Sequence, residues 1–298
     1  MSAPVASLAV LSHAAGCRTH CPYCAYQCGV VMSQPGGGAW TVAGDPQFPV
    51  NNGQLCIKGW TAAELLGNPD RVTTPLMRTA AGKLAPAAWG EALDFVADGI
   101  RRIRAEHGPE AVGLFGSGAL TNEKAYLLGK FARLAVGTPH MDYNGRFCMS
   151  SAAGAGNKAF GIDRGLPFPV SDIADAEVIL LVGANSADTL PPIMQGFDRQ
   201  KANGGRLIVA DPRRSATART ADLHLPVTPG SDLALANGLL FLAIEERLID
   251  EAYIASRTVG FDAVRSAVLT YDPPRVERIT GVREAALRTC VRWLAEAE

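Results

Sequence analysis

Apolar and polar residues follow two different periods along this chain, and the clearest of them predicts a helix beginning at Trp89. Apolar residues recur there at spacings of three and four, namely Trp89, Leu93, Val96, Ile100 and Ile103. This spacing places them on one stripe of an α-helix. Gly108-Pro109 follows, and a glycine followed by a proline is a typical helix ending.

Short apolar runs that end in glycine or polar residues predict the strands of a parallel sheet. Residues 111–115 form a short buried strand that runs into Gly116-Ser117-Gly118. The pattern returns at residues 177–182 and 206–210, with a helix expected over 192–203 between them. We predict successive strands of one doubly wound sheet, whose ligands gather at the carboxyl ends of the strands.

The two ends of the chain show weaker patterns. Residues 34–38 are turn material, and residues 40–46 predict a short strand followed by a turn. Residues 229–232 are expected to open a helix that continues to about Glu245. Residues 250–298 read as short helices separated by turns.

Composition is that of an ordinary globular protein. The 298 residues are 48% apolar and 19% charged, with a net charge of -1, which gives no electrostatic argument for nucleic acid or a membrane surface. No apolar run approaches the ~20 residues of a membrane span. Residues 1–16 lack a basic region and an arginine pair, so we expect no export signal and a cytoplasmic protein. Seven cysteines, an odd number, favour a reducing compartment over a disulfide framework.

Four of the cysteines form the strongest chemical signal in the sequence. Cys21, Cys24 and Cys28 lie within eight residues, and Cys56 follows after 27 intervening residues. This spacing favours a 4Fe-4S cluster, since structural zinc usually takes two separated Cys-x2-Cys pairs. Zinc and a disulfide or inert role are the alternatives. Cys17 is a rival to Cys56 as the fourth ligand.

Two further residues have both a chemical and an ordinary interpretation. Lys58, two residues after Cys56, is either a solvated lysine or a bridge from the cluster to an anionic redox partner. Cys148, taken alone, fits a buried small apolar side chain better than a reactive centre. Its small neighbours, however, suit a bulky cofactor, and a thiolate suits a late-row metal. Cys290 is expected in the core with Leu287 and Leu294.

Polar groups at the strand ends suggest a nucleotide site. Asp211 ends one strand and could bind a ribose or a base edge, while Arg213 and Arg214 suit phosphate. The ordinary alternative is a helix N-cap with two surface arginines. Residues 230–232 open a helix whose N-terminus could hold an anionic or nucleotide group.

Together these motifs resemble the molybdopterin-dependent oxidoreductases that carry a bis(molybdopterin guanine dinucleotide) cofactor, among them nitrate reductases and formate dehydrogenases. The resemblance runs from about Cys17 to the C-terminus. It implies an α/β fold, with a 4Fe-4S domain at 14–72, a first α/β segment at 73–142 and a Rossmann-like dinucleotide-binding domain at 143–298. Family members are much longer, so we expect the C-terminal barrel-like domain to be absent, either because this is a fragment or because a separate chain supplies it.

The resemblance also assigns roles to individual residues. It implies that the cluster ligands are Cys21, Cys24, Cys28 and Cys56. It places Lys58 between cluster and pterin, and makes Cys148 the thiolate ligand of molybdenum. Cofactor contacts are implied for Asn144, Gly183, Asn185, Asp188, Asp211, Pro212, Arg213, Arg214, Gly230, Ser231 and Asp232.

The residue after the metal-binding cysteine indicates the reaction. Formate dehydrogenases of the family typically have histidine there, whereas Met149 with the following serines resembles the nitrate reductases. We therefore expect reduction of nitrate to nitrite, in the assimilatory branch, with single electrons from a ferredoxin, a flavodoxin or an NADH-linked reductase. Formate dehydrogenase, a non-catalytic iron-sulfur electron-transfer module and a zinc-stabilised nucleotide-binding protein remain alternatives.

Overall fold

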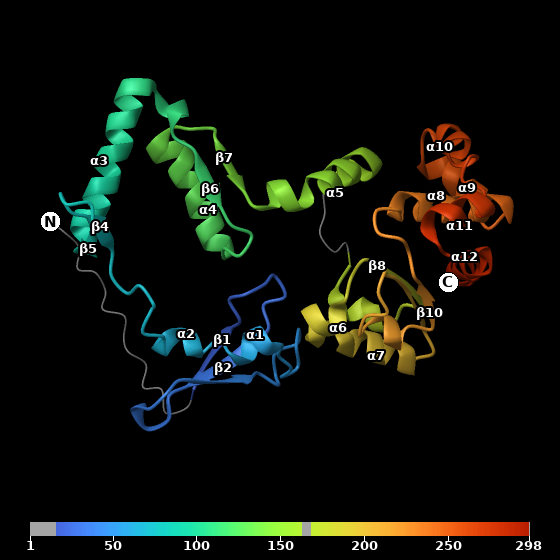
Figure 1. Ribbon diagram of the computed structural model, residues 1–298, viewed down its shortest axis with the longest axis horizontal. Helices are drawn as coiled ribbons and strands as arrows, with labels where there is room; N and C mark the ends of the chain where they lie inside the picture. The colour runs from blue at the N-terminus through green and yellow to red at the C-terminus, as the bar shows by residue number, and fades with distance from the viewer. Residues whose placement is uncertain (1–15, 163–167, 298) are drawn as a thin grey trace. The chain divides into compact units, whose positions relative to one another are not determined.

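The computed structural model describes residues 16–162 and 168–297, and it divides the chain into two compact units between residues 167 and 168 (Figure 1). The chain is of the mixed α/β class, as the sequence predicted. The boundaries expected at residues 72 and 142 both fall inside the first unit, and they stay predictions.

The first unit begins with a small antiparallel sheet of three strands in the order β1-β2-β3. The strands are β1 (Cys17–His20), β2 (Gly29–Ser33) and β3 (Thr41–Gly44). A 3-10 turn, Pro35–Gly37, joins β2 to β3, so the turn and the strand expected between residues 34 and 46 are confirmed. Val30 of β2 is buried and packs with Cys21, Cys28 and Leu55 in one apolar cluster.

Two single-turn helices and a hairpin lead to the longest helix of the chain. These elements are α1 (Ile57–Trp60), α2 (Glu64–Gly67), β4 (Leu76–Arg78), β5 (Leu84–Pro86) and α3 (Trp89–His107). Helix α3 begins where the backbone N–H of Ala88 donates to Glu91 Oε2 at 3.1 Å. It ends at Gly108, whose φ of 84° only glycine adopts without strain. The predicted helix and its ending are confirmed.

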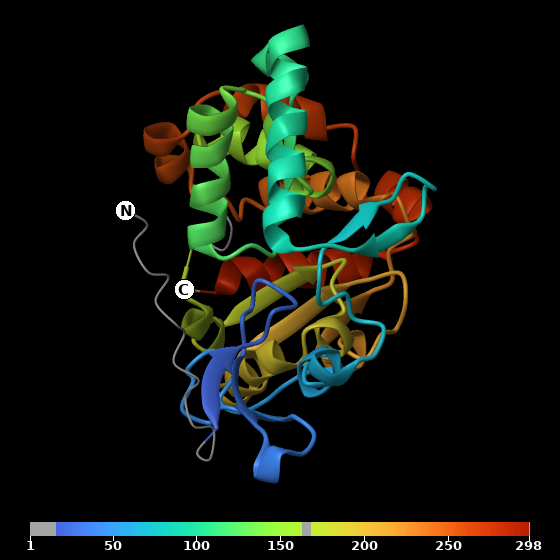
Figure 2. The ribbon, with the colours of Figure 1, turned by 90° about the vertical axis from the view of Figure 1, so that its left-hand side faces the viewer.

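Helix α3, drawn in blue-green in Figure 2, carries its apolar residues on one stripe. That stripe is exposed. None of the 19 residues is buried, and Trp89, Leu93 and Val96 keep 66%, 60% and 55% of their surface exposed. The periodicity thus predicted which face of α3 is apolar. Whether that face is buried depends on other elements packing against it, and the sequence of the helix does not specify those elements. Among the helices of the described ranges, none combines the length and the apolar character needed to cross a membrane.

The rest of the first unit is built around a pair of short parallel strands. Its elements are β6 (Leu114–Gly116), α4 (Asn122–Lys130), a π-helical turn at Phe131–Val136, β7 (Met141–Tyr143) and α5 (Gly145–Phe160). Strand β6 was predicted over 111–115 as a buried strand, and this is wrong in two respects. Residues 109–111 form a 3-10 turn, and Phe115 is 63% exposed because β7 alone pairs with β6 among the described strands.

A parallel sheet in the order β10-β9-β8 forms the centre of the second unit. The strands are β8 (Val178–Val182), β9 (Arg206–Ala210) and β10 (Leu223–Leu225). The crossover from β8 to β9 contains α6 (Ser186–Thr189), a 3-10 turn at Pro191–Ile193 and α7 (Met194–Ala202). The strands predicted at 177–182 and 206–210 are therefore confirmed as neighbours in one sheet. The earlier run at 111–115 belongs to the separate β6–β7 pair.

Alternate residues of β9 point to opposite sides of this sheet, and both sides are covered. Ile208 and Ala210 enter the larger core, whereas Leu207 and Val209 pack with Ala218 on the other side. Near-continuous apolar strands of this kind are typical of parallel sheets buried on both faces. The doubly wound prediction holds for this unit.

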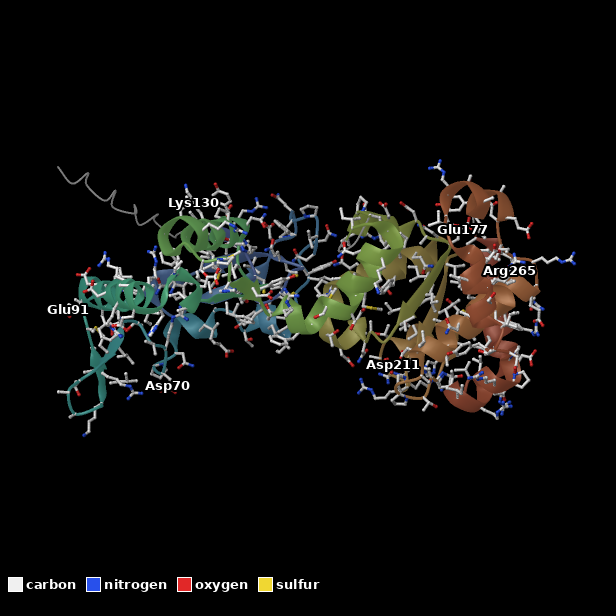
Figure 3. The ribbon with its side chains drawn as sticks, turned by 90° about the horizontal axis from the view of Figure 1, so that it is seen from above. Asp70, Glu91, Lys130, Glu177, Asp211 and Arg265 are labelled. Carbon is white, nitrogen blue, oxygen red and sulfur yellow. The ribbon has the colours of Figure 1, made fainter. Side chains whose placement is uncertain are left out.

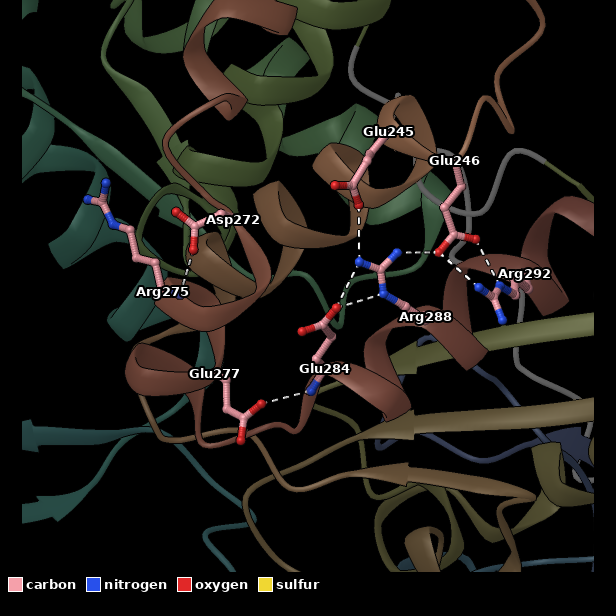
Figure 4. Close-up of polar contacts among 8 residues, drawn as sticks. All are labelled: Glu245, Glu246, Asp272, Arg275, Glu277, Glu284, Arg288 and Arg292. Atoms are coloured by element: carbon pink, nitrogen blue, oxygen red, sulfur yellow. Dashed lines mark hydrogen bonds and ion pairs between the residues drawn. The ribbon is translucent and has the colours of Figure 1, made fainter.

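Five helices complete the second unit, and an ion network connects the end of the first of them with the last (Figure 4). The helices are α8 (Asp232–Glu245), α9 (Glu251–Arg257), α10 (Phe261–Val268), α11 (Pro273–Thr280) and α12 (Glu284–Glu296). Cys290 and Leu287 are fully buried in the core as predicted, although Leu294 is 38% exposed. Arg288 of α12 donates to Glu246 at 2.6 Å and to Glu284 at 2.8 Å. Arg292 donates to the same Glu246 at 2.8 Å.

The pH dependence of Glu246 provides a test of this network. Hydrogen bonds from Arg292 and Arg288 lower the pKa of Glu246 from its ordinary value of 4.5. Because the folded pKa is depressed, the stabilisation is present above pH 4.5 and is lost as the pH falls through the folded value. We expect Glu246→Gln to lower the free energy of unfolding at pH 7 by about 1 kcal/mol, a modest figure because Arg292 is half exposed.

The measurement is denaturant unfolding of both proteins from pH 7 to pH 3. The wild-type advantage should shrink below pH 4.5. The matched control is Asp98→Asn, which removes an ion pair to Arg101 whose two side chains are each 73% exposed, and it should change little. An advantage for wild type that is independent of pH would contradict the account.

Candidate cofactor sites

The loop from Cys21 to Cys28 is closed on itself by backbone hydrogen bonds. The N–H of Cys21 donates to the carbonyl of Cys28 at 2.8 Å, so the two ends of the loop are adjacent. Inside it, Gln27 N–H donates to the carbonyl of Cys24 at 3.1 Å, and Gln27 has a φ of 51°. This positive φ turns the chain back within three residues of Cys24. The loop therefore gathers three thiols around one small region.

Asn51 joins the distant segment that carries Cys56 to this loop. Its side chain is fully buried; Oδ1 accepts from Gly29 N–H at 2.7 Å, and Nδ2 donates to the Gly29 carbonyl at 3.2 Å and to the Gln54 carbonyl at 2.7 Å. A Cβ on Gly44 would lie 1.9 Å from the carbonyl oxygen of Gly53, so the two backbones touch there. Asn51 was not among the predicted site residues, although the turn sequence Asn51-Asn52-Gly53 was an available signal.

The electrostatics of the thiols link the four cysteines. Burial, followed by the neighbouring thiols of Cys21, Cys24 and Cys56, raises the pKa of the Cys28 thiol to about 11. The pKa of Cys21 is raised mainly by burial, and Cys24 and Cys56 act in the same direction. Thiols that lie together in a partly buried site resist ionisation unless a cation compensates their charge. This donor set fits a cationic core bound by several thiolates.

The structure also bears on the choice between Cys17 and Cys56. Cys17 lies on β1, opposite Met32, and the extended strand separates it from His20 by about 10 Å at ~3.3 Å per residue. Cys56, in contrast, interacts electrostatically with both Cys21 and Cys28. This favours Cys56 as the fourth ligand. Within the described ranges, no three His, Cys, Asp or Glu side chains lie close enough together to hold a single metal ion, so the thiols are neighbours that do not form a single-ion site. A 4Fe-4S cluster is larger than one ion and holds its thiolates farther apart.

Lys58 lies on α1, directly beside the site. Its side chain is exposed, and its ammonium group lowers the pKa of Cys21 against the larger effect of burial. Cys56 is the N-cap of α1, so Lys58 is held within one turn of that residue. Lys58 is therefore a solvent-exposed cation near the thiols, and its bridging role stays a prediction.

Cys148 and Asn144 lie at the start of α5. Both are exposed, and the N–H of Cys148 donates to the backbone carbonyl of Asn144 at 3.3 Å. The side chain of Asn144 accepts from Gly118 N–H at 2.7 Å, which connects it to the Gly116-Ser117-Gly118 turn at the carboxyl end of β6. The interpretation of Cys148 as a buried apolar residue is therefore wrong, because α5 leaves its thiol accessible.

In the second unit, the loop after β8 is fixed by polar side chains. Gly183 adopts a φ of 65°, and its N–H donates to the Ala210 carbonyl at 2.9 Å. Asn185 Nδ2 donates to Asp188 Oδ2 at 2.6 Å, while Asn185 Oδ1 accepts from the hydroxyl of Thr217 at 2.9 Å. Thr217 was not among the residues that sequence reasoning selected.

The loop after β9 brings acidic and basic groups to the same edge. Asp211, labelled in Figure 3, is 6% exposed and accepts at Oδ1 from the N–H of Arg213 at 2.7 Å. Its carbonyl accepts from His224 Nε2 at 2.8 Å, so that ring nitrogen carries the proton. Pro212, Arg213 and Arg214 are exposed. The Asp211 carboxylate thus has a structural role in the turn, while the two guanidinium groups face solvent.

The third loop of the sheet edge leads into α8. Gly230 has a φ of 82°, and Ser231 Oγ donates to the Thr228 carbonyl at 2.6 Å. Ser231 is buried, whereas Asp232 at the first position of α8 is exposed. Ser231 therefore holds the turn, and Asp232 is the side chain available to a ligand.

The predicted site residues fall into groups, each within one unit. Cys21, Cys24, Cys28, Cys56 and Lys58 come together in the first unit, where Asn144 and Cys148 form a second group on α5. The remaining predicted contacts occupy the three loops at one edge of the β8–β9–β10 sheet. The ligand roles of individual residues stay predictions.

Comparison with known sequences identifies the family. The family described as Molybdopterin oxidoreductase matches residues 71–271, and its Fe4S4 domain matches residues 16–68. The chain belongs to the molybdopterin oxidoreductase family, as the sequence motifs indicated. Its domains are those that carry a 4Fe-4S cluster and molybdenum with molybdopterin, and the gathered thiols and the sheet edge with two exposed arginines fit these groups.

Individual relatives include two kinds of oxidoreductase. The chain is 43% identical over 273 residues to the "Assimilatory nitrate reductase catalytic subunit" of Bacillus subtilis, covering 91% of this chain and 38% of that protein. It is 35% identical over 286 residues to "Formate dehydrogenase H" of Escherichia coli, covering 94% and 40%. The solved structure of "Acetylene Hydratase from Pelobacter acetylenicus" matches with a TM-score of 0.80 and 26% identity, over 92% of this chain and 38% of that one. The chain thus spans about two fifths of the length of these proteins.

Replacing single cysteines tests the ligand set. We expect Cys56→Ser to lose most of the bound iron and the visible iron-sulfur absorbance, because a cluster with a missing thiolate is poorly held. Cys17→Ser is the matched control on the neighbouring strand, and it should retain both. Iron content and absorbance of the anaerobically purified proteins are the measurements. Loss of iron in Cys17→Ser with full retention in Cys56→Ser would reverse the assignment.

Proposed function

We propose that this chain is the cluster-bearing, cofactor-binding part of a molybdenum enzyme that reduces nitrate to nitrite. The 4Fe-4S and molybdopterin oxidoreductase domains support the general chemistry, and the Bacillus subtilis relative supports nitrate as the substrate. The formate dehydrogenases at 35–36% identity are the main competitor for the reaction.

Met149 is the residue on which the preference for nitrate over formate as substrate rests. It follows Cys148 directly on α5, is 43% exposed, and has no group that takes up a proton. Oxidation of formate requires removal of hydrogen from carbon, for which a base beside the reacting centre is useful. Reduction of nitrate by loss of an oxygen atom requires an electron supply rather than a base at that position. A methionine in this place therefore favours nitrate.

The acidic residue on β7, just before α5, also supports this choice. Asp142 accepts a hydrogen bond from Arg146 Nε at 2.6 Å, and that hydrogen bond holds the pKa of Asp142 below its ordinary value. A carboxylate that is paired with a guanidinium in this way is a weak proton acceptor near neutral pH. Arg146 lies two positions before Cys148 and attracts an anion, which suits nitrate and formate equally.

The proposal assigns the following roles to this chain. Cys21, Cys24, Cys28 and Cys56 hold the cluster, and Lys58 lies beside it as a cation. Cys148 offers its exposed thiolate to the metal, and Asn144 orients the start of α5 through Gly118. When bound, the molybdenum-pterin group supplies the centre that accepts an oxygen atom from the substrate.

The sheet-edge loops hold the remainder of a bis(molybdopterin guanine dinucleotide) in this proposal. Arg213 and Arg214 pair with its phosphates, because exposed guanidinium groups match phosphate oxygens with two donors each. The predicted contacts at Gly183, Asn185, Asp188, Pro212, Gly230, Ser231 and Asp232 belong to the same edge. The electron donor is a ferredoxin, a flavodoxin or an NADH-linked reductase, and the protein works in the cytoplasm in nitrate assimilation.

Activity of the full-length protein is the direct test. We expect the anaerobically prepared protein to oxidise a reduced viologen dye when nitrate is added, with nitrite appearing in proportion. Cys148→Ala should abolish this turnover while the iron-sulfur absorbance stays, because the variant removes a metal ligand and leaves the cluster ligands in place.

A parallel assay with formate and oxidised dye separates the alternatives. Activity with formate alone would show that Met149 was a misleading guide to the substrate. Nitrate-dependent turnover that survives in Cys148→Ala would contradict the role of Cys148. No turnover with either substrate in protein that contains both cofactors would contradict the proposed function.

A further inference from the structure

We propose that Thr217 is a positioning residue whose hydroxyl orients the amide of Asn185, so that this amide holds the Asp188 carboxylate at the ligand-binding edge of the second unit. The inference rests on the proposed cofactor role of residues 183–188. It adds a residue from a different loop, after β9, to that site.

Three hydrogen bonds join Thr217 to the loop after β8. Its hydroxyl donates to Asn185 Oδ1 at 2.9 Å, and its backbone N–H donates to the same oxygen at 3.3 Å. The N–H of Ala187 donates back to Thr217 Oγ1 at 2.9 Å. Thr217 is completely buried, so water does not compete for these bonds.

These contacts determine which way the amide of Asn185 faces. An amide has an acceptor oxygen on one side and an NH2 donor on the other. With two donors from Thr217 on its oxygen, its nitrogen must face Asp188, and Nδ2 donates to Asp188 Oδ2 at 2.6 Å. The reversed amide would bring its NH2 against the N–H of Thr217 and its oxygen against a carboxylate. Both contacts would be repulsive, so Thr217 excludes that orientation.

The result is a fixed carboxylate at an exposed place. Asp188 is exposed, while Thr217 is buried. Asp188 can therefore contact a ligand, whereas Thr217 only fixes the loop that carries Asp188. A carboxylate accepts N–H or O–H donors from a ligand, and an oriented carboxylate loses less freedom on binding than a mobile one. Thr217 therefore contributes to binding without touching the ligand.

Thr217→Val removes the hydroxyl and keeps the shape of the side chain. The N–H of Ala187 then lacks its acceptor, and the amide of Asn185 keeps only the backbone donor. We expect hydrogen exchange of the Ala187 amide, measured by NMR on the labelled chain, to rise about tenfold, as the loss of one hydrogen bond implies. Thr217→Ser restores the hydroxyl and should return exchange to the wild-type rate.

Thr280→Val is the matched control for loss of a buried hydroxyl. Thr280 is also completely buried, and its hydroxyl donates to Val276 and accepts from Val282 N–H. This variant should lose stability to a similar extent, yet exchange at Ala187 should not change in it. A merely structural effect of Thr217→Val would appear equally in Thr280→Val.

The second readout is the nucleotide content of the full-length protein, measured as GMP released by acid. We expect Thr217→Val to retain several-fold less GMP than wild type, and Thr217→Ser to retain the wild-type amount. Asn185→Asp keeps an acceptor for Thr217 but removes the donor to Asp188. In Asn185→Asp, hydrogen exchange of the Ala187 amide should therefore stay slow, while the GMP content should fall. This variant also tests the proposal if Thr217→Val does not fold.

The outcomes separate this inference from the proposed function. Unchanged exchange at Ala187 in Thr217→Val overturns the bracing role. Faster exchange with full GMP content overturns the role in cofactor binding and leaves the proposed function standing. Wild-type protein that releases no GMP overturns the proposed dinucleotide cofactor, and with it the cofactor role of Thr217, whereas the exchange data still decide whether Thr217 braces the loop.

Discussion

The first unit depends on bringing together thiols that are far apart in the sequence. Cys28 and Cys56 are separated by 27 residues, and the side chain of Asn51 makes hydrogen bonds to both backbone groups of Gly29, directly after Cys28. A module of this size, with strands of four and five residues, has little apolar surface to bury. The gathered thiols are unfavourable as charged groups on their own, so the bound cluster is expected to contribute to the folding free energy of the module.

A side-chain amide that hydrogen-bonds the backbone of another segment is found at the other sites too. Asn51, Asn144 and Asn185 each accept a hydrogen bond from the backbone of another segment: from Gly29, from Gly118 and from Thr217. In each case a side-chain amide fixes one loop against another at a place where a cofactor is proposed to bind. Loops that carry functional groups have few apolar contacts to hold them, and these side-chain amides supply the missing constraint.

The features that could be predicted from the sequence are those that depend on residues close together along the chain. Strand β9 was predicted with its observed bounds, because an apolar run buried on both faces is unambiguous. The family was predicted from cysteine spacing and strand-end motifs. Strands β7 and β10 were missed because three residues carry no period, and α5 because its small residues form no apolar stripe. The roles of Asn51 and Thr217 depend on partners 22 and 32 residues away, which no local pattern reveals.

The central claim is that four thiols of one module bind a 4Fe-4S cluster. The most direct measurement is iron, sulfide and zinc analysis of the anaerobically purified protein, together with electron paramagnetic resonance after reduction. We predict about four iron and four sulfide per chain, no zinc, and a paramagnetic signal that appears on one-electron reduction. One zinc ion per chain, with neither sulfide nor such a signal, would contradict it.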